Sequence, residues 1–267
     1  MDFDWGNFVS TLVGAFAGAL GAYWFNIKQE EKQQKENEKS QLVQLFYDLN
    51  ILSKYLCIYG SNVIQLITNI YNGATPYNTP LYMEPETINI DKLGFITLKS
   101  NKMYEILAHT RMNIASIYEQ GIIYNEKVIN KKKDTITQLV SICFLFPKLM
   151  AMIYVCFFNI NSILIKYYKS DNLIKDNILN SMSEILEILD NYKKEHNEIS
   201  NNKDNICMYT GKPYTQEQIN QEKENIDYID YILNDWILDF GLSKKSIKNI
   251  VNNIKNKLHG NEVKNDL

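Results

Sequence analysis

Residues 8–27 form an uncharged apolar run of 20 residues that constrains the fold more than any other segment. At about 1.5 Å per residue, a helix of this length spans about 30 Å, the thickness of the hydrocarbon core of a bilayer. The run is therefore predicted to be a transmembrane helix. A cleaved signal peptide is one alternative, but such a peptide begins with basic residues, whereas Asp2 and Asp4 precede this run. A buried helix of a soluble protein is the other alternative.

Small residues recur at every fourth position of this run. They are Ser10, Gly14, Gly18 and Ala22. A row of small side chains lets a second helix backbone approach closely in lipid. Gly and Ala are also common in membrane helices that have no partner, but the regular spacing favours self-association. We therefore expect the lipid bilayer and further copies of this chain as partners.

The charges on either side of the run predict its orientation. No Lys or Arg lies in residues 1–7, whereas Lys28, Lys32, Lys35 and Lys39 follow the run. Basic residues flanking a membrane helix favour the cytoplasmic side. Residues 1–7 are thus predicted to be an extracytoplasmic stub and the rest of the chain to be cytoplasmic, at a bacterial inner membrane.

The sequence after the run predicts an all-α protein. Residues 28–41 contain no Gly or Pro and are predicted to be a charged helical stalk. Within a cytoplasmic helical domain at 42–267, apolar residues recur with helical period and no strand-like alternation competes. The predicted helices lie at 42–72, 98–131, 173–199, 215–240 and 244–259, with Gly60 as a possible break and a Pro-containing loop at 73–95.

Residues 134–169 are the most apolar part of the predicted cytoplasmic domain. We expect a central core helix here. The alternative is a second membrane pass at 139–165, in which Lys148 would lie near mid-bilayer at a cost of roughly 2.5–3.5 kcal/mol.

Composition argues against several classes of function. The 28 basic and 31 acidic residues nearly balance, so nucleic acid is not expected as a direct ligand. The four cysteines (Cys57, Cys143, Cys156 and Cys207) lack metal-ligand spacing, and we predict neither a metal nor a cofactor. Common catalytic motifs are absent, as is the Arg/His pair typical of HEPN ribonucleases. A non-enzymatic role is favoured, although folding can assemble a site from distant residues.

Two groups of polar residues are candidate contact sites. Arg111 is the only arginine, and a guanidinium can make two parallel hydrogen bonds that lysine cannot. With Glu105, His109 and Asn113 it forms a candidate ligand or partner contact, for which a solvated helix face is the alternative. The predicted last helix carries Lys244, Lys245, Lys248, Lys255 and Lys257, which suit an anionic membrane surface or simply a solvated face of a packed helix.

The order of these segments resembles that of small bacterial membrane proteins of prophage and anti-phage loci, including abortive-infection and CRISPR-ancillary effectors. The resemblance covers about the first 60 residues, from the acidic start through the small-residue run to the Glu/Lys/Gln-rich stalk. It implies an oligomeric effector that perturbs the membrane on a cytoplasmic signal. A membrane-tethered scaffold that recruits a cytoplasmic protein or nucleic-acid complex is the alternative function.

Overall fold

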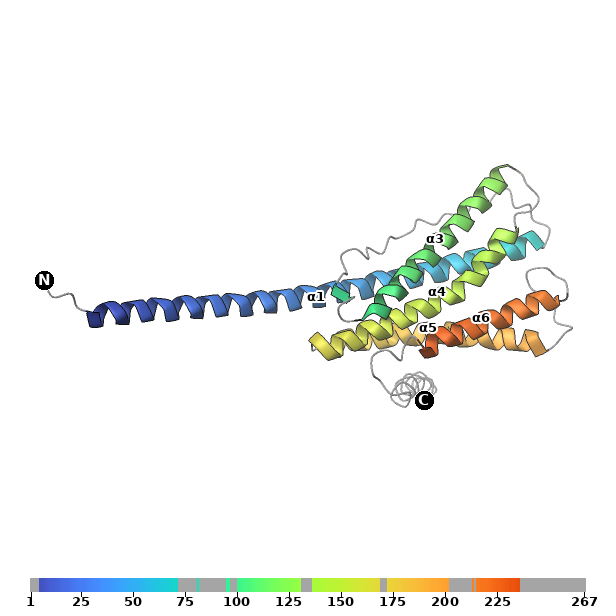
Figure 1. The fold of residues 1–267 in the computed structure, drawn as a ribbon. Coiled ribbons are helices and arrows are strands. Elements are labelled where there is room, and N and C mark those ends of the chain that lie inside the picture. The colour runs from blue at the N-terminus through green and yellow to red at the C-terminus, as the bar shows by residue number, and fades with distance from the viewer. Residues whose placement is uncertain are drawn as a thin grey trace, which may run out of the picture. The chain divides into compact units, whose positions relative to one another are not determined.

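The computed structural model describes residues 5–71, 81, 95–96, 100–130, 136–168, 172–201, 213 and 215–235, and within these ranges it describes all side chains except those of residues 5–9, 71, 101, 195–201 and 235. In these ranges the chain forms five α-helices and one π-helical turn, with no β-strand (Figure 1). The prediction of an all-α fold is confirmed. The elements are α1 (Trp5–Tyr71), α3 (Asn101–Ile129), α4 (Ile136–Ile163), η3 (Leu164–Tyr168), α5 (Asn172–Asn201) and α6 (Gln216–Asp235).

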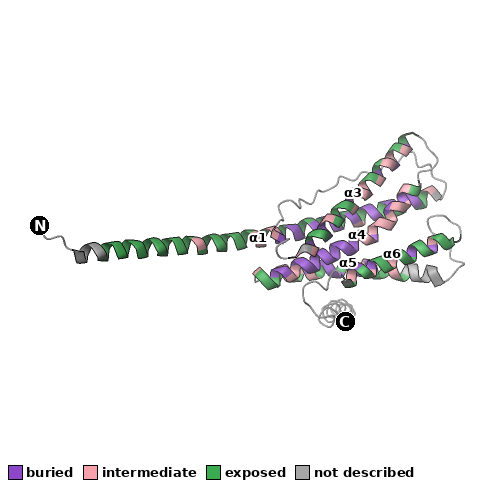
Figure 2. Ribbon diagram, viewed as in Figure 1, coloured by how far each residue is buried: buried purple, intermediate pink, exposed green. Residues whose placement is uncertain are grey.

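The chain divides into two units, Met1–Leu42 and Val43–Leu267. The first unit contains the first part of α1, whose side chains from Ser10 to Asn37 are all exposed apart from the half-buried Ile27 (Figure 2). Helix α1 does not break at Gly60 but continues to Tyr71.

Helix α4 is the centre of the second unit. Every residue from Leu149 to Ile160 is buried, and a helix that is apolar and buried on all sides belongs in the middle of a bundle (Figure 2). The helix also continues through Pro147. An interior proline disfavours a helix by about 3 kcal/mol, so packing around this segment must offset that cost.

Among the described side chains, Ile136–Tyr168 is the one helical segment long and apolar enough to cross a membrane, with a mean hydropathy of 2.1. Of its most apolar stretch, 61% is buried inside the protein. Core helices of soluble proteins have the same length and composition, and they too are mostly buried. Residues 8–27 are not fully covered by this finding, because the side chains of Phe8 and Val9 lie outside the description.

Helices α1 and α3 both run antiparallel to α4. On α1, Phe46 packs its ring against Phe157 with centroids 5.1 Å apart, and Gly60 lies against Phe146. On α3, the Thr110 hydroxyl lies 3.9 Å from the Cys156 sulfur. Nearer the start of α4, Lys127 of α3 donates a 2.9 Å hydrogen bond to Gln138. It follows that α1 and α3 run in the same direction.

Local capping explains where two of the helices begin. The Ser100 hydroxyl accepts a 3.2 Å hydrogen bond from the Met103 backbone N–H at the start of α3. At α6, the Thr215 hydroxyl accepts from the Gln218 N–H, and the Gln218 side chain accepts from the Thr215 N–H. This reciprocal pair is a capping box, which satisfies two backbone donors that have no partner inside the helix.

The predicted helices at 98–131 and 173–199 correspond to α3 and α5 within a few residues, and the apolar region 134–169 corresponds to α4 with η3. Helix α6 begins where predicted but is described only to Asp235. The predicted loop at 73–95, apart from Leu81 and Phe95, and the whole of the predicted helix at 244–259 lie outside the described residues.

Candidate functional site

The first unit carries a set of large apolar side chains that nothing in the described structure covers. Each is between 56% and 67% exposed. They are Leu12, Val13, Phe16, Leu20, Tyr23, Trp24 and Phe25. Scattered exposed apolar residues are ordinary, but a continuous helical stretch of them marks a surface that lipid or another protein covers.

Large and small side chains occupy different sides of this stretch. At about 100° of rotation per residue, all of the large residues except Phe25 fall within an arc of about 120°. The four predicted contact residues, Ser10, Gly14, Gly18 and Ala22, fall on the remaining part of the circumference and are exposed as well. We call this small-residue side the glycine face. Phe25 lies on this face as well, beyond Ala22. From Ser10 to Ala22 the helix therefore has a bulky side suited to lipid chains and a flat side suited to another helix.

The glycines of α1 separate into two kinds when their surroundings are compared. A Cβ added at Gly60 would lie 3.2 Å from the Phe146 ring, so internal packing accounts for this glycine. A Cβ added at Gly14, Gly18 or Gly21 would meet nothing within 4 Å. Each interior glycine disfavours a helix by about 1 kcal/mol relative to alanine. The glycine face thus bears a cost that no contact within the described chain offsets.

The end of the apolar run is marked by a charged and aromatic pair. The Lys28 ammonium lies 3.8 Å from the centre of the Trp24 ring. Amphipathic rings and lysines of this kind collect at the headgroup level of bilayers. The pair lies where the predicted membrane segment would meet the cytoplasmic headgroups.

The second unit holds a buried polar cluster among α4, α5 and α6. Glu222 of α6 is 3% exposed, and its carboxylate accepts a 2.9 Å hydrogen bond from the Tyr192 hydroxyl of α5. The positive charge of Lys148 on α4 favours the ionised form of this carboxylate. The Lys148 ammonium also lies 5.4 Å from the centre of the Tyr228 ring. Asn225, one turn further along α6, is 4% exposed, and its amide nitrogen has no hydrogen-bond partner in the described ranges.

Burial raises the pKa of Glu222 from 4.5 to about 7, although the Tyr192 hydrogen bond and the positive charge of Lys148 partly oppose this rise. Removing a carboxylate from water disfavours its charged form. The group therefore changes charge near neutral pH. Because the Glu222 carboxyl is enclosed between helices, its titration affects how α5 and α6 pack together.

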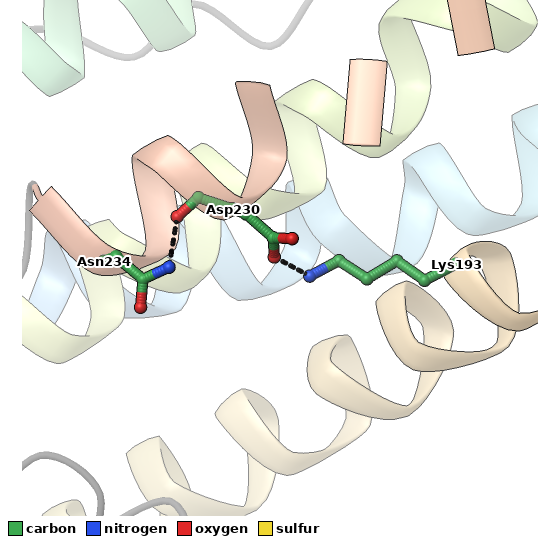
Figure 3. Close-up of polar contacts among 3 residues, drawn as sticks. All are labelled: Lys193, Asp230 and Asn234. Atoms are coloured by element: carbon green, nitrogen blue, oxygen red, sulfur yellow. Dashed lines mark hydrogen bonds and ion pairs between the residues drawn. The ribbon is translucent and has the colours of Figure 1, made fainter. Parts of the chain in front are cut away.

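Nearer the surface, α5 and α6 are joined by an ion pair. Lys193 of α5 points at the Asp230 carboxylate of α6, and Asn234 donates a 2.7 Å hydrogen bond to the Asp230 backbone carbonyl (Figure 3). The Asp230 side chain is half exposed. Partly exposed ion pairs contribute at most about 1 kcal/mol, so this one orients the helices more than it stabilises them.

The structure does not bring the four residues around Arg111 together. Glu105, His109 and Asn113 lie along one side of α3, whereas Arg111 lies on another. The amide nitrogen of Asn113 donates 2.9 Å to the His109 carbonyl and lies 3.4 Å from the Met152 sulfur, so it points toward α4. Arg111 is exposed and forms no ion pair with any described residue.

The five lysines of the predicted last helix lie outside the described residues. In the described ranges, no three His, Cys, Asp or Glu side chains gather in a way that could hold a metal ion, and Cys57, Cys143 and Cys156 are free thiols.

Sequence reasoning missed the cluster around Glu222, although a signal was present. Glu222 interrupts the apolar face of α6 between Ile219 and Ile226, at positions where the helical period demands burial. A charged residue on such a face predicts a buried polar contact.

Comparison with protein-family models, with curated proteins and with solved structures gives no match.

Proposed function

We propose that this protein is an oligomeric effector of the bacterial inner membrane, which residues 8–27 anchor and which perturbs the bilayer on a cytoplasmic signal. The glycine face carries this proposal, because its Gly14 and Gly18, together with the neighbouring Gly21, have no packing role in the described chain. Close approach of a second membrane helix would give these glycines a packing role. The exposed bulky side supports the anchor, and the resemblance to anti-phage effectors supports a role in defence.

In this proposal α4 remains the core helix of a cytoplasmic bundle and is not a second pass. Its burial within the protein and its contacts with α1, α3 and α6 support this assignment. A helix that left the bundle would expose the apolar faces of all its neighbours to water.

Membrane potential tests the proposal directly. Inducing the chain in bacteria should depolarise the inner membrane, and Gly14→Leu with Gly18→Leu should abolish the effect by keeping helices apart. Val13→Leu with Leu20→Phe is the matched control, because it changes the bulky side of the same helix and should retain the effect. An unchanged potential on induction of the wild-type chain contradicts the proposal.

The anchor has a separate test. After alkaline extraction the full chain should remain with the membrane pellet, and Phe16→Lys, which places a charge in the apolar run, should shift it toward the soluble fraction. Wild-type chain in the soluble fraction would rule out the anchor.

A tethered binding module is the second candidate function, and Arg111 favours it. An exposed guanidinium with no described ion pair is available for a carboxylate or phosphate of a partner. This function predicts a stoichiometric protein partner in affinity purifications that Arg111→Lys removes, with no depolarisation by the protein alone.

A further inference from the structure

Two neighbouring helices of the second unit carry exposed apolar stripes. On α1 the stripe consists of Tyr47, Ile51, Tyr55 and Ile58, which are 38–63% exposed. On α3 it consists of Tyr104, Met112, Ile122 and Ile129, which are 38–78% exposed. Ala108 and Ala115 lie between the large residues of α3, so that Ala108, Ala115, Ile122 and Ile129 recur every seven residues. Arg111, Glu119 and Glu126 are exposed on the same side of α3, so the stripe combines a line of apolar residues with charged ones.

Contacts inside the bundle place the two stripes on one surface. The Tyr59 hydroxyl of α1 lies 2.9 Å from the position of a Cβ on Gly121 of α3, which sets the two helices level at these residues. Because α1 and α3 run in the same direction, Ile51 is then roughly level with Asn113 of α3. At about 100° per residue, both stripes point away from α4. We call this surface the α1/α3 face.

We propose that the α1/α3 face binds the same face of a second copy of this chain, with corresponding helices parallel. The inference rests on the proposed function in one respect, since anchoring in one membrane supplies the high local concentration that the contact uses.

The exposed area suits such a contact. A large side chain has about 200 Å² of surface, so the eight large residues, about half exposed, present on the order of 800 Å². One partner of a standard protein interface buries about 800 Å². The face is therefore large enough for a second copy and larger than a small ligand needs.

Charge at its edges selects the second copy and its direction. Lys54 is exposed on the outer edge of the α1 stripe, and Glu119 is exposed on the outer edge of the α3 stripe. From the Tyr59–Gly121 level, Lys54 stands about three residues, or roughly 4.5 Å, from the height of Glu119. When two such faces meet with parallel helices, the α1 helix of each copy lies over the α3 helix of the other. Lys54 of each copy then approaches Glu119 of the other, which gives two such pairs. An antiparallel arrangement instead brings like charges together.

Cross-linking with isotope labels tests this arrangement in the full chain. Unlabelled and ¹⁵N-labelled chains are mixed in detergent and treated with a carbodiimide, which joins an amine to a carboxylate. Mass spectrometry should find Lys54 of one copy linked to Glu119 of the other. Absence of this mixed link overturns the inference.

Charge reversal gives an independent readout. Lys54→Glu or Glu119→Lys alone should weaken association of the full chain about tenfold, because each sets like charges opposite one another twice. The double variant Lys54→Glu/Glu119→Lys should restore it, and Glu187→Lys on the exposed side of α5 should have no effect. A double variant no stronger than either single one overturns the inference, as does finding a different protein bound to this face instead.

These outcomes separate the inference from the proposed function. Loss of depolarisation in the Gly14→Leu/Gly18→Leu chain with no Lys54–Glu119 link leaves the function standing and removes the α1/α3 contact. A mixed link in a chain that alkaline extraction leaves in the soluble fraction removes the proposed function and leaves the α1/α3 contact standing.

Discussion

A carboxyl that is 3% exposed, as that of Glu222 is, holds its proton to a higher pH than one in water, because the charged form loses its hydration. Here the pKa is about 7 in the folded protein against an ordinary value of 4.5. Between these values the folded chain keeps a proton that the unfolded chain has lost. The free energy of unfolding therefore falls as pH rises through this window and levels off above it.

Glu222→Gln should remove this dependence. The variant should be up to about 3 kcal/mol more stable than wild type at pH 8 and nearly equal to it at pH 4.5, since glutamine stays neutral and still accepts from Tyr192. Denaturant unfolding at the two pH values measures the difference. Glu187→Gln, at an exposed carboxyl, is the control. Equal stabilities of wild type and Glu222→Gln at pH 8 would contradict the assignment.

Asn159 is a second polar residue that lies in the buried core. It is fully buried in α4, and neither its amide oxygen nor its nitrogen has a hydrogen-bond partner in the described structure. Asn159→Leu should raise the free energy of unfolding by about 1–3 kcal/mol, because an unsatisfied buried amide costs that much. Asn69→Leu, on the exposed side of α1, should give no such gain. Destabilisation by Asn159→Leu would mean that the amide is satisfied by groups outside the described ranges.

At the scale of elements, the contact between α1 and α3 depends on the absence of a side chain at Gly121. Tyr59 is 4% exposed and lies where a Cβ on Gly121 would come within 2.9 Å of its hydroxyl. A buried ring has little room to retreat in a close-packed interior. The two helices therefore approach closely only with glycine at this position.

Gly121→Ala should lower the free energy of unfolding by about 1 kcal/mol despite the better helix propensity of alanine. In a Tyr59→Phe background, which removes the hydroxyl, the same substitution should be neutral or stabilising. A double-mutant cycle measured by denaturant unfolding gives the coupling. No coupling between positions 59 and 121 would show that this contact does not limit the packing.

Period and composition were enough to predict most elements of this bundle. Apolar residues at helical spacing predicted α3 and α5, and the apolar run around Leu149–Ile160 predicted a buried centre. Pro147 was a weaker guide, because tertiary packing offsets its local cost. The position of Glu222 on the apolar face of α6 signals a buried polar contact, but its partners Tyr192 and Lys148 come from other helices and could not be predicted from the sequence.

For the whole molecule, the decisive question is which apolar segment meets lipid. The segment at 8–27 presents exposed large residues, whereas α4 has comparable length but is largely buried. Apolar side chains avoid water equally well in lipid and in a protein core, so their composition does not separate the two. Only burial by other parts of the protein does. The burial of α4 favours a core helix there, and the anchor at residues 8–27 is our proposal, because composition alone allows either segment to span a membrane.

In the proposed topology, a reporter fused to the C-terminus should give a cytoplasmic signal, since a single pass with its N-terminus outside leaves all later residues inside. Alkaline phosphatase, active only outside, and a fluorescent protein, active inside, make a complementary pair of measurements. Deleting residues 8–27 should release the fusion from the membrane. An external signal would require either that α4 is a second pass or that residues 8–27 insert in the opposite orientation.

In the proposed function, the titration of Glu222 has a consequence for a leak across the membrane. Protons entering from outside would acidify the cytoplasm and neutralise this carboxyl, which tightens the very bundle that holds α5 and α6 against α4. The folded domain would then grow more robust as the cell lost its gradient. The proposed effector would thus remain folded in the acidified cytoplasm, and its action would be slow to reverse.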